Sequence, residues 1–438
     1  MKTFKRIFAV ILALVLSASS LVCFAADDSK QYHNYKKVLL LGDSQASGYS
    51  DYRDVYSEFC YVEESYAAYL AKDLGAELLP FACPGFRTIE LRYMLDDNYA
   101  GDDRLFNAVP SLPREAFEAS KPYIRQAIKD ADLITIGIGG NDWGAYLTWI
   151  MASVQLENKL PEEFRNELKK FLKNASFEDN IIEKIVEIAD YCNALDELAT
   201  ALPEAMSYGV RNMRTNWNYI VEYIYENNPD VTLMAIGMFA GDYKTTKDEP
   251  DVIIESDPIT SAIENYIVNF GNEHVLSNQE KYGYIFVDTK GTIVEESHPT
   301  VAGHRFIADR ILEELPDARF DLTDIKAGQA NYKAVEYMYL NGLMNATADK
   351  TFNGSTNITK ADFSALMNNY NTVYPVSTSD KPVTLLEVKL AAFITAENKT
   401  VNDLFNLLSY FAKLSFINDA FAPATRMQVA AEFYSYIR

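Results

Sequence analysis

Short runs of apolar, often β-branched residues alternate with longer segments of helical period between Lys37 and about Leu315. Alternation of this kind is typical of a parallel sheet whose faces are covered by helices. Five of the short runs are predicted to be strands: Lys37 to Leu41, Glu77 to Phe81, Leu133 to Ile138, Val231 to Met238, and Tyr282 to Val287. The pattern therefore predicts an α/β fold built on a five-stranded parallel sheet.

Two segments between or after these strands have clear helical signals. Tyr61 to Leu74 carries apolar residues at helical spacing and stops at Gly75, where a left-handed cap is easily formed. A second helix is expected from Pro299 to Leu315, with the proline in its first turn. With flanking helices of this kind, the sheet is predicted to form a three-layer, flavodoxin-like arrangement.

The segment from about residue 146 to residue 228 is helical in pattern throughout and is too long for a plain crossover between two strands. It is interpreted as a helical insertion. One hypothesis is that it simply packs on the sheet. The other is that it forms a cap over the active site and shapes the choice of substrate.

The composition changes after Pro316, and the remaining residues are predominantly helical in pattern. A chain of 438 residues, of which 48% are hydrophobic, is long enough for two cores. We therefore predict one domain over residues 33–318 and a smaller all-α domain over residues 319–438.

The first 25 residues have the layout of a bacterial secretory signal. A basic start precedes an apolar run from Ile7 to Leu16, and small residues lead to Ala25. The run is about half the length of a membrane-spanning helix, and Ala25 suits the position before a cleavage site. We predict removal of residues 1–25, with lipidation of Cys23 as the competing hypothesis. No later stretch is predicted to be a transmembrane segment.

Charge and cysteine content narrow the classes of partner. The formal net charge is -22, which argues against nucleic acid because phosphate binding needs a basic surface. Cys60, Cys83 and Cys192 would remain after cleavage, so at most one disulfide is expected. Their spacing is not that of a metal site, and no metal or other cofactor is predicted.

Three of the predicted strands lead into residues that suit acyl transfer. The first runs into Gly42-Asp43-Ser44, the third into Gly139-Gly140-Asn141-Asp142, and the fifth is followed by His298. Carboxyl ends of parallel strands meet at one edge of a sheet, so Ser44, Asn141 and His298 are expected to lie together. A histidine can activate a serine, and an amide can stabilise the developing oxyanion.

These segments resemble the conserved blocks of SGNH (GDSL-type) hydrolases. The matching segments are Gly42-Asp43-Ser44, Ala82-Cys83-Pro84-Gly85, Gly139-Gly140-Asn141-Asp142, and His298-Pro299 before Ala302-Gly303-His304. The resemblance implies a nucleophile at Ser44 and a general base at His298. It also implies an oxyanion hole made by the backbone N–H groups of Ser44 and Gly85 with the Asn141 side chain. Members of this family are esterases, lipases and carbohydrate deacetylases that need no metal.

The chain departs from that family at the acidic residue. The family pattern places an aspartate three residues before the histidine, and this chain has Glu295 there. We expect Glu295 to orient the imidazole of His298, with Glu296, Asp288 or a backbone carbonyl as the alternatives. Asp288 is otherwise expected to end the fifth strand, and Asp43 to give structural support beside the nucleophile.

The remaining histidines are assigned no part in catalysis. His304 lies inside a predicted helix and is expected to pack or cap locally. His33 and His274 stand in no comparable sequence context.

Beyond residue 319, the sequence resembles an S-layer homology (SLH) repeat. The resemblance rests on the segment Tyr332 to Leu343 with a helix ending at Gly342, the segment Asn345 to Asp349, and a helix opened by Thr359. Weaker echoes, each a threonine before an amphipathic helix, begin at Thr384 and Thr425. The resemblance implies noncovalent attachment to a cell-wall glycopolymer. The alternative is a degenerate helical appendage.

These observations predict a secreted serine ester hydrolase associated with the bacterial cell surface. Its substrate would be a small-molecule or polysaccharide ester, with acetylated carbohydrate as the leading candidate. A lipase or phospholipase acting on long acyl chains is the alternative within the same chemistry. A noncatalytic cell-wall binding protein is the alternative from another class.

Overall fold

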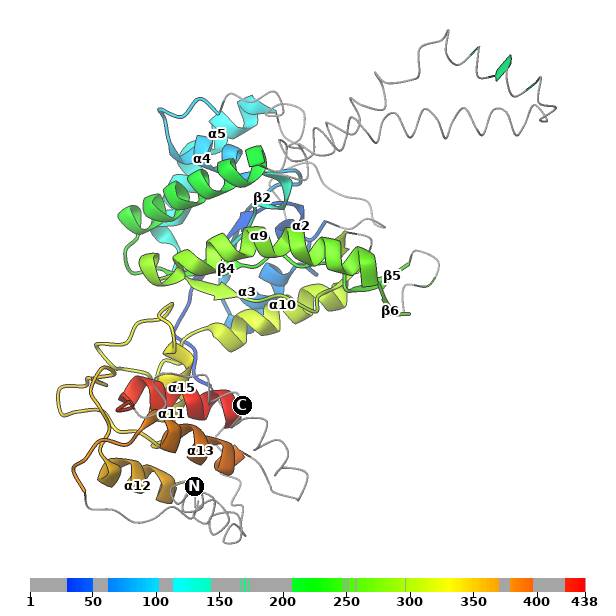
Figure 1. Ribbon diagram of the computed structural model, residues 1–438. Coiled ribbons are helices and arrows are strands. Elements are labelled where there is room, and N and C mark those ends of the chain that lie inside the picture. Colours follow the sequence, from blue (N-terminus) through cyan, green and yellow to red (C-terminus); the bar gives the residue numbers. More distant parts are fainter. Residues whose placement is uncertain are drawn as a thin grey trace. The chain divides into compact units, whose positions relative to one another are not determined.

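The computed structural model describes residues 30–49, 62–101, 113–142, 207–246, 252–256, 258–295, 297–369, 379–396 and 422–437, with a few isolated positions between them. The predicted leader, Cys60, Cys192, Glu296 and most of the predicted helical insertion lie outside these residues. The chain divides into two compact units (Figure 1). The first is Asn34–Leu315. The second is Pro316–Arg438 together with the described residues before Asn34.

The first unit is built on a parallel sheet of five strands in the order β2-β1-β3-β4-β7. Every neighbouring pair is parallel, as predicted. The strands are β1 (Lys37–Gly42), β2 (Glu77–Ala82), β3 (Leu133–Gly137), β4 (Thr232–Ile236) and β7 (Ile285–Val287). All five coincide with the apolar runs of the sequence, so the α/β fold class is confirmed.

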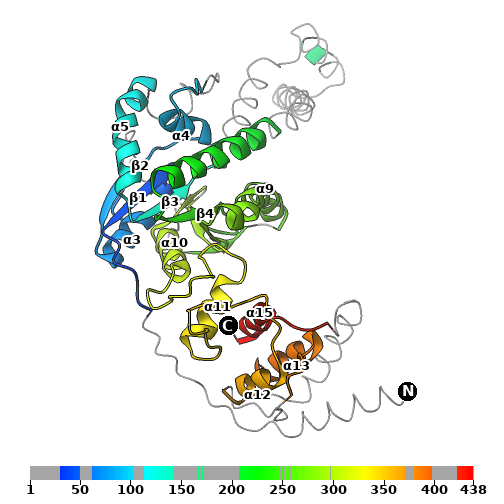
Figure 2. The same ribbon diagram turned by 90° about the vertical axis from the view of Figure 1, so that its left-hand side faces the viewer.

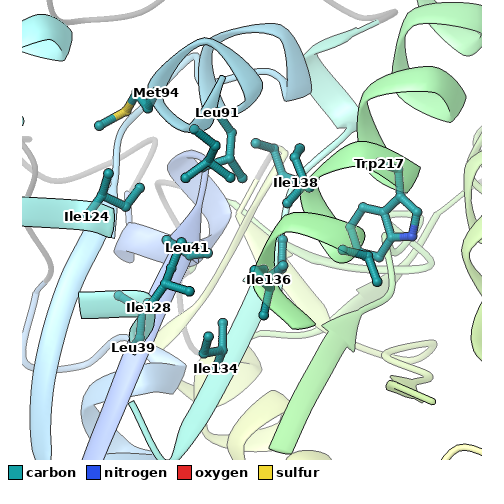
Figure 3. Close-up of a cluster of buried hydrophobic side chains, with 14 of the residues drawn as sticks. Leu39, Leu41, Leu91, Met94, Ile124, Ile128, Ile134, Ile136, Ile138 and Trp217 are labelled. Atoms are coloured by element: carbon teal, nitrogen blue, oxygen red, sulfur yellow. The ribbon is translucent and has the colours of Figure 1, made fainter. Parts of the chain in front are cut away.

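Side chains alternate between the two faces of this sheet, and both faces are buried. Leu39 and Leu41 of β1 join the main hydrophobic cluster on one face, while Val38 and Leu40 are equally buried on the other. Figure 3 shows this cluster, in which side chains of β1 and β3 meet Trp217 and residues of two helices. Burial on both faces explains why the strands are almost continuously apolar.

Helices cover each face and complete the three layers (Figure 2). The face of the main cluster is covered by α4 (Thr88–Leu95), α5 (Arg114–Asp130) and a helix over residues 207–227. The opposite face carries α3 (Tyr66–Leu74) and α10 (Val301–Glu314), which pack against each other. A long helix, α9 (Pro258–Tyr282), leads into β7 and contributes Val275 to the main cluster.

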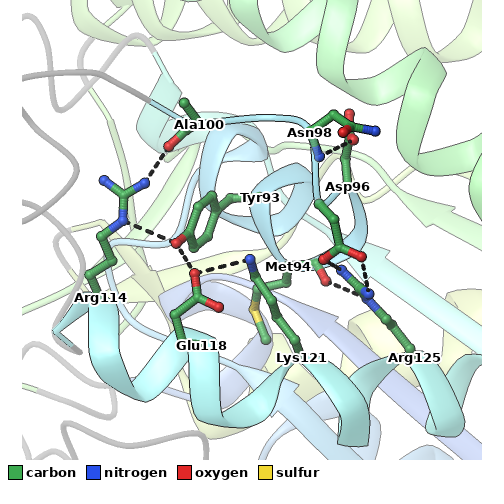
Figure 4. A network of polar contacts seen from close by, with 10 residues as sticks. Tyr93, Met94, Asp96, Asn98, Ala100, Arg114, Glu118, Lys121 and Arg125 are labelled. Carbon is green, nitrogen blue, oxygen red and sulfur yellow. Dashed lines mark hydrogen bonds and ion pairs between the residues drawn. The ribbon is translucent and has the colours of Figure 1, made fainter.

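Polar contacts join α4 to α5 at the surface of the main cluster (Figure 4). Arg114 Nε donates to the hydroxyl of Tyr93 at 3.1 Å, and Arg125 Nε donates to the carbonyl of Met94 at 2.9 Å. Lys121 Nζ lies 3.8 Å from the centroid of the Tyr93 ring, within the range of a cation–π contact. These contacts fix α4, which begins next to the candidate site.

The helix starts follow capping side chains, and one prediction here was wrong. Ser65 and Thr300 accept hydrogen bonds from the backbone N–H of Ala68 and Gly303, so α3 and α10 begin after them. Pro299 was predicted in the first turn of α10, but it lies before the cap and pairs with Val294 in a short strand. The threonine oxygen offers the first turn a hydrogen-bond acceptor, which outweighs the preference of proline for that turn.

A second, smaller sheet was not predicted. Its order is β6-β5-β8-β9, with β5 (Tyr243–Thr245), β6 (Ile254–Glu255), β8 (Ile293–Glu295) and β9 (His298–Pro299). Strands of two or three residues are too short to show a periodic pattern. The hairpin β8–β9 nevertheless determines where His298 lies.

The second unit is helical, as predicted, and three of its described helices begin at the expected threonines. The helices among the described residues of this unit are α11 (Tyr332–Leu340), α12 (Lys360–Asn369), α13 (Leu385–Ala396) and α15 (Arg426–Ile437). The side chains of Thr359, Thr384 and Thr425 each accept a hydrogen bond from the N–H three residues later. In the second and third cases, the side chains of Glu387 and Gln428 accept a hydrogen bond from the threonine N–H, which completes a capping box.

Backbone hydrogen bonds close the three threonine segments into a ring. The N–H of Ile358 donates to the carbonyl of Ala424, that of Ala424 to Val383, and that of Val383 back to Ile358, at 2.9–3.0 Å. Each segment therefore contacts the other two. This cyclic arrangement supports the interpretation of the unit as three related repeats.

Gly42 ends β1 where the chain turns toward the candidate nucleophile. Its φ is +158°, and a Cβ at this position would lie 2.4 Å from the carbonyl oxygen of Gly137 and 2.5 Å from Cβ of Ala46. The N–H of Asp43 also donates to the Gly137 carbonyl at 3.1 Å. Glycine is therefore required here for β1 and β3 to end side by side.

We predict that Gly42→Ala lowers the free energy of unfolding by about 2–3 kcal/mol, because the methyl group overpacks the junction. Gly283→Ala is the matched control, since Gly283 has a φ of +86° but a Cβ added there would meet no atom within 4 Å. The control should lose about 1 kcal/mol from its backbone conformation alone. Urea unfolding followed by tryptophan fluorescence measures both, and equal losses would contradict the steric argument.

Candidate active site

The backbone turn after β1 presents Ser44 at the carboxyl edge of the sheet. Ser44 is the first residue of the short helix α2 (Ser44–Ser47), and Asp43 caps that helix through a hydrogen bond from the N–H of Gln45 to Oδ1, at 2.9 Å. Burial raises the pKa of Asp43 to about 7, with the charge of Asp142 adding to the effect. Asp43 thus holds the serine turn, in the supporting role expected from its sequence position.

His298 reaches Ser44 from a distant part of the chain. Its Nε2 lies 2.9 Å from Oγ of Ser44, across 254 positions of sequence. The ring also lies against Tyr49, with 4.6 Å between the two ring centroids. A hydrogen bond of this length and type is the contact that a serine nucleophile and its base require.

The β8–β9 hairpin and α10 hold His298 in this place. The N–H of Thr300 donates to the carbonyl of Ile293 at 3.0 Å, which closes the hairpin onto the start of α10. A Cβ on Gly303 would lie 2.2 Å from that same carbonyl oxygen. Glycine at position 303 therefore lets the helix approach the hairpin closely.

Two polar residues are close neighbours of His298 in the β8–β9 hairpin. Ser297 Oγ lies 3.0 Å from Nδ1 of His298. Glu295 is directly opposite His298 in the antiparallel pair β8–β9 and is 8% exposed. Residues opposite each other in such a pair have Cβ atoms about 5 Å apart, so the two side chains leave the hairpin next to each other.

Asp288 and Glu296 were the other carboxylates considered as the acidic residue. Oδ1 of Asp288 accepts a hydrogen bond from the N–H of Lys290 at 2.9 Å, and its carbonyl accepts one from Nε of Arg310. Asp288 therefore forms the turn after β7, in agreement with the expectation that it ends the fifth strand. Glu296 lies outside the described residues.

Asn141 lies at the end of the loop after β3. Its Nδ2 donates to the carbonyl of Phe86 at 3.1 Å and lies 3.5 Å from Oδ2 of Asp43, at the limit of a hydrogen bond. The contact with Phe86 orients the amide, which lines the same pocket as Ser44. This is the position in which a donor to an oxyanion is useful.

Gly85 lies in the turn that precedes Phe86. Its φ is +77°, and the N–H of Phe86 donates to the carbonyl of Cys83 at 3.0 Å. Proline at the second position and a left-handed glycine at the third suit a type II turn. Gly85 is not among the described residues that line the pocket discussed below. It directly precedes Phe86, whose carbonyl accepts the hydrogen bond from Asn141.

A buried polar network behind Asn141 was missed by sequence reasoning. Asp142 accepts hydrogen bonds from both the N–H and the hydroxyl of Thr88, at the start of α4. Asn216, from the helix over residues 207–227, donates to the same hydroxyl at 3.3 Å. The only sequence signal was the place of Asp142 directly after Asn141, since Thr88 and Asn216 are distant in the chain.

A buried ion pair continues this network. Arg87 contacts Glu90 through its guanidinium group, and the N–H of Arg87 donates to the Glu90 carboxylate at 2.9 Å. Burial raises the pKa of Glu90 to about 7, while the charge of Arg87 opposes this shift. The pair holds the loop that carries Gly85 and Phe86 in front of α4.

Ser44, Asn141 and His298 line one pocket of about 290 Å³. Its other walls are largely apolar and were also missed by sequence reasoning; the apolar residues are Met238, Phe239, Ala240, Val268 and Val294. Volumes near 300 Å³ with a few polar groups among apolar walls are typical of small-ligand sites. The pocket therefore combines the three reactive side chains with room for a substrate.

Two further histidines and one cysteine, His304, His274 and Cys83, do not line this pocket. His304 is fully buried in α10, with its ring centroid 6.2 Å from that of Tyr66, and this is consistent with a packing role. His274 lies in α9 with its Nδ1 3.5 Å from Nδ2 of Asn278, and burial lowers its pKa. Cys83 is a buried thiol 3.6 Å from the carbonyl of Pro84.

Within the described part of the chain, no group of three or more His, Cys, Asp and Glu side chains is arranged to hold a metal ion. Within the same residues, no helix has both the length and the apolar character of a membrane span.

Two family models match this chain. The model of the GDSL-like lipase/acylhydrolase family matches residues 38–311, and the model of the S-layer homology domain matches residues 321–364. The first range includes the serine, the asparagine and the histidine that meet in the pocket. No curated protein is significantly similar in sequence to this chain.

Several solved structures are similar in fold. The extracellular lipase from Streptomyces rimosus is 17% identical, with a TM-score of 0.37 over 64% of this chain and 99% of that one. The phospholipase A1 from Streptomyces albidoflavus NA297 is 15% identical, with a TM-score of 0.34 over 64% and 99%. A family two carbohydrate esterase from Clostridium thermocellum is 14% identical, with a TM-score of 0.30 over 65% and 64%. At these values the likeness does not identify a substrate.

Proposed function

Because the chain belongs to the GDSL-like lipase/acylhydrolase family, we propose that it hydrolyses carboxylic esters, with Ser44 as nucleophile and His298 as general base. The observation that carries this proposal is the 2.9 Å contact between Oγ of Ser44 and Nε2 of His298 at the edge of a 290 Å³ pocket. A neutral imidazole with a lone pair on Nε2 is suited to remove the serine proton.

The reaction would proceed in two halves. Oγ of Ser44 attacks the acyl carbonyl carbon as His298 takes its proton, and the protonated imidazole then returns this proton to the leaving alcohol. Water, deprotonated by His298, next attacks the acyl-serine, and His298 passes the proton to Oγ of Ser44 as the carboxylic acid leaves. Charge on the carbonyl oxygen would be stabilised by Nδ2 of Asn141 and by the N–H groups of Ser44 and Gly85.

Asn141 is prepared for this task before substrate arrives. Its hydrogen bond to the carbonyl of Phe86 fixes the plane of the amide, and the Asp142–Thr88 contacts fix the backbone that follows. A donor that does not need to reorient is worth more to a transition state than one that does.

We predict that Ser44→Ala lowers kcat on p-nitrophenyl acetate by at least about 1,000-fold without unfolding the protein. The residual rate of His298→Ala should be similar, because the two side chains act as a unit. Rates measured by nitrophenolate release, with circular dichroism as the control for folding, test this. Equal rates for Ser44→Ala and wild type would exclude the assignment, and binding to cell wall without any ester hydrolysis would favour a noncatalytic binding protein.

We further propose that Glu295 orients His298 and stabilises the imidazolium that forms during the reaction. Its support is the direct pairing of the two residues across the β8–β9 hairpin and the burial of the carboxylate. A hydroxyl such as that of Ser297 can fix the tautomer but carries no charge to balance the imidazolium.

Glu295→Gln is therefore expected to lower kcat by about 100-fold while leaving KM nearly unchanged, since the loss is confined to the charged transition state. Glu296→Gln and Ser297→Ala are the matched variants on the same hairpin, and each should retain most of the wild-type kcat. A large loss in either variant, with normal activity in Glu295→Gln, would assign the role to that residue instead.

The SLH domain indicates association with the bacterial cell surface. We propose that the protein is exported by means of residues 1–25 and is held noncovalently on a cell-wall glycopolymer by its second unit. A location beside wall and capsule polymers supports acetylated polysaccharide as the substrate class. The ring of three threonine segments supports an intact binding domain over a degenerate appendage.

The full-length mature protein is expected to sediment with purified cell walls and to remain in solution when the walls have been stripped of glycopolymer by acid extraction. The control is the same assay on Ser44→Ala, which should sediment equally, because this residue belongs to the other unit. Equal sedimentation with intact and stripped walls would contradict a glycopolymer receptor.

A further inference from the structure

The loop that follows β4 forms the apolar wall of the pocket. Met238, Phe239 and Ala240 succeed one another along this wall, and each is less than 10% exposed. Three consecutive apolar side chains next to a nucleophile offer a surface for hydrocarbon and not for sugar hydroxyls. The wall is therefore suited to the acyl part of an ester.

This wall is held rigidly although the loop belongs to no strand. Asn272 of α9 accepts a hydrogen bond from the N–H of Met238 at 2.8 Å and donates one to its carbonyl at 2.7 Å. Its amide thus pairs with Met238 as a neighbouring strand would. One residue earlier, the carbonyl of Gly237 accepts from the hydroxyl of Thr289 at 2.7 Å. The wall has little freedom to widen around a longer chain.

The side chain of Met238 runs between two glycines. A Cβ on Gly140 would lie 4.0 Å from Sδ of Met238, and a Cβ on Gly271 would lie 1.9 Å from its Cε. Gly140 lines the pocket beside Asn141, whereas Gly271 lies in α9. The thioether therefore extends from the pocket to the helix behind it, into space left by the missing side chain at position 271.

The chemistry of acyl transfer leaves one direction for the acyl chain. The carbonyl oxygen must point to Asn141, and the leaving oxygen must lie near His298, which returns the proton to it. The third substituent of the carbonyl carbon then faces the remaining wall, at Met238 and Phe239. We propose that Met238 is the specificity-determining residue that ends the acyl pocket and restricts the enzyme to short acyl groups. This inference rests on the ester hydrolase function proposed above.

Two substitutions should change the acyl preference in opposite directions. Met238→Ala removes the three outer atoms of the side chain and opens the pocket toward α9. Gly271→Ala places a methyl group where Cε of Met238 now lies, and because the end of this side chain is flexible, it moves away from the helix toward the pocket. The first variant lengthens the pocket and the second shortens it.

The experiment compares kcat/KM for p-nitrophenyl esters from acetate to decanoate. Wild type should prefer acetate to butyrate and lose at least about tenfold by octanoate. In Met238→Ala the ratio of octanoate to acetate should rise by at least about tenfold, and in Gly271→Ala the ratio of butyrate to acetate should fall by a similar factor. Leu276→Ala, on the exposed side of the same helix, should keep the wild-type profile.

The outcomes separate this inference from the proposed function. Each protein is also assayed with Ser44→Ala added. If hydrolysis depends on Ser44 but Met238→Ala and Gly271→Ala both keep the wild-type profile, or if wild type prefers decanoate, the acyl-pocket inference fails and the hydrolase function stands. If hydrolysis does not depend on Ser44, the proposed function fails first. Ratios within one protein are unaffected by the fraction that is folded, so partial unfolding of a variant does not obscure the result.

Discussion

The hydrogen bond between Ser44 and His298 is the constraint around which the first unit is organised. A serine on a four-residue helix and a histidine on a two-residue strand have no local structure that could fix 2.9 Å between them. The distance is set by what surrounds each residue. Gly42 lets β1 end against β3, and Gly303 lets α10 approach the hairpin that carries the histidine.

The side chains around Asn141 are unusually polar for a protein interior. Asp43, Asp142 and Glu90 are all buried within the same region, and burial raises the pKa of Asp43 and of Glu90. Carboxylates in such surroundings are tolerated when each is hydrogen-bonded or paired, as here with Gln45, Thr88 and Arg87. Burying these carboxylates around Ser44 costs desolvation free energy that an apolar core would avoid. Their hydrogen bonds hold the surrounding backbone in a fixed geometry.

Much of this could be predicted from the sequence, because strands that are buried on both faces have a strong pattern. The five strands, the strand-end placement of Ser44 and Asn141, and the threonine caps of the second unit all follow from local signals. The small sheet does not, since strands such as β9 are shorter than any periodicity, and Pro299 was consequently assigned to a helix. The network of Asp142, Thr88 and Asn216 was inaccessible for a different reason: its members come from separate elements, and no local pattern records which of them meet. The apolar wall at Met238 was also missed, because its residues look like the end of a strand.

The ring of backbone hydrogen bonds in the second unit has a consequence for how that unit is made. A linear array of repeats can fold step by step as each repeat leaves the ribosome, because each one contacts only its neighbours. In this unit the N–H of Ile358 in the first segment finds its acceptor at Ala424, close to the carboxyl terminus. The first repeat therefore remains incomplete until the third threonine segment has been synthesised, and loss of that segment would remove a hydrogen-bond partner from both of the others.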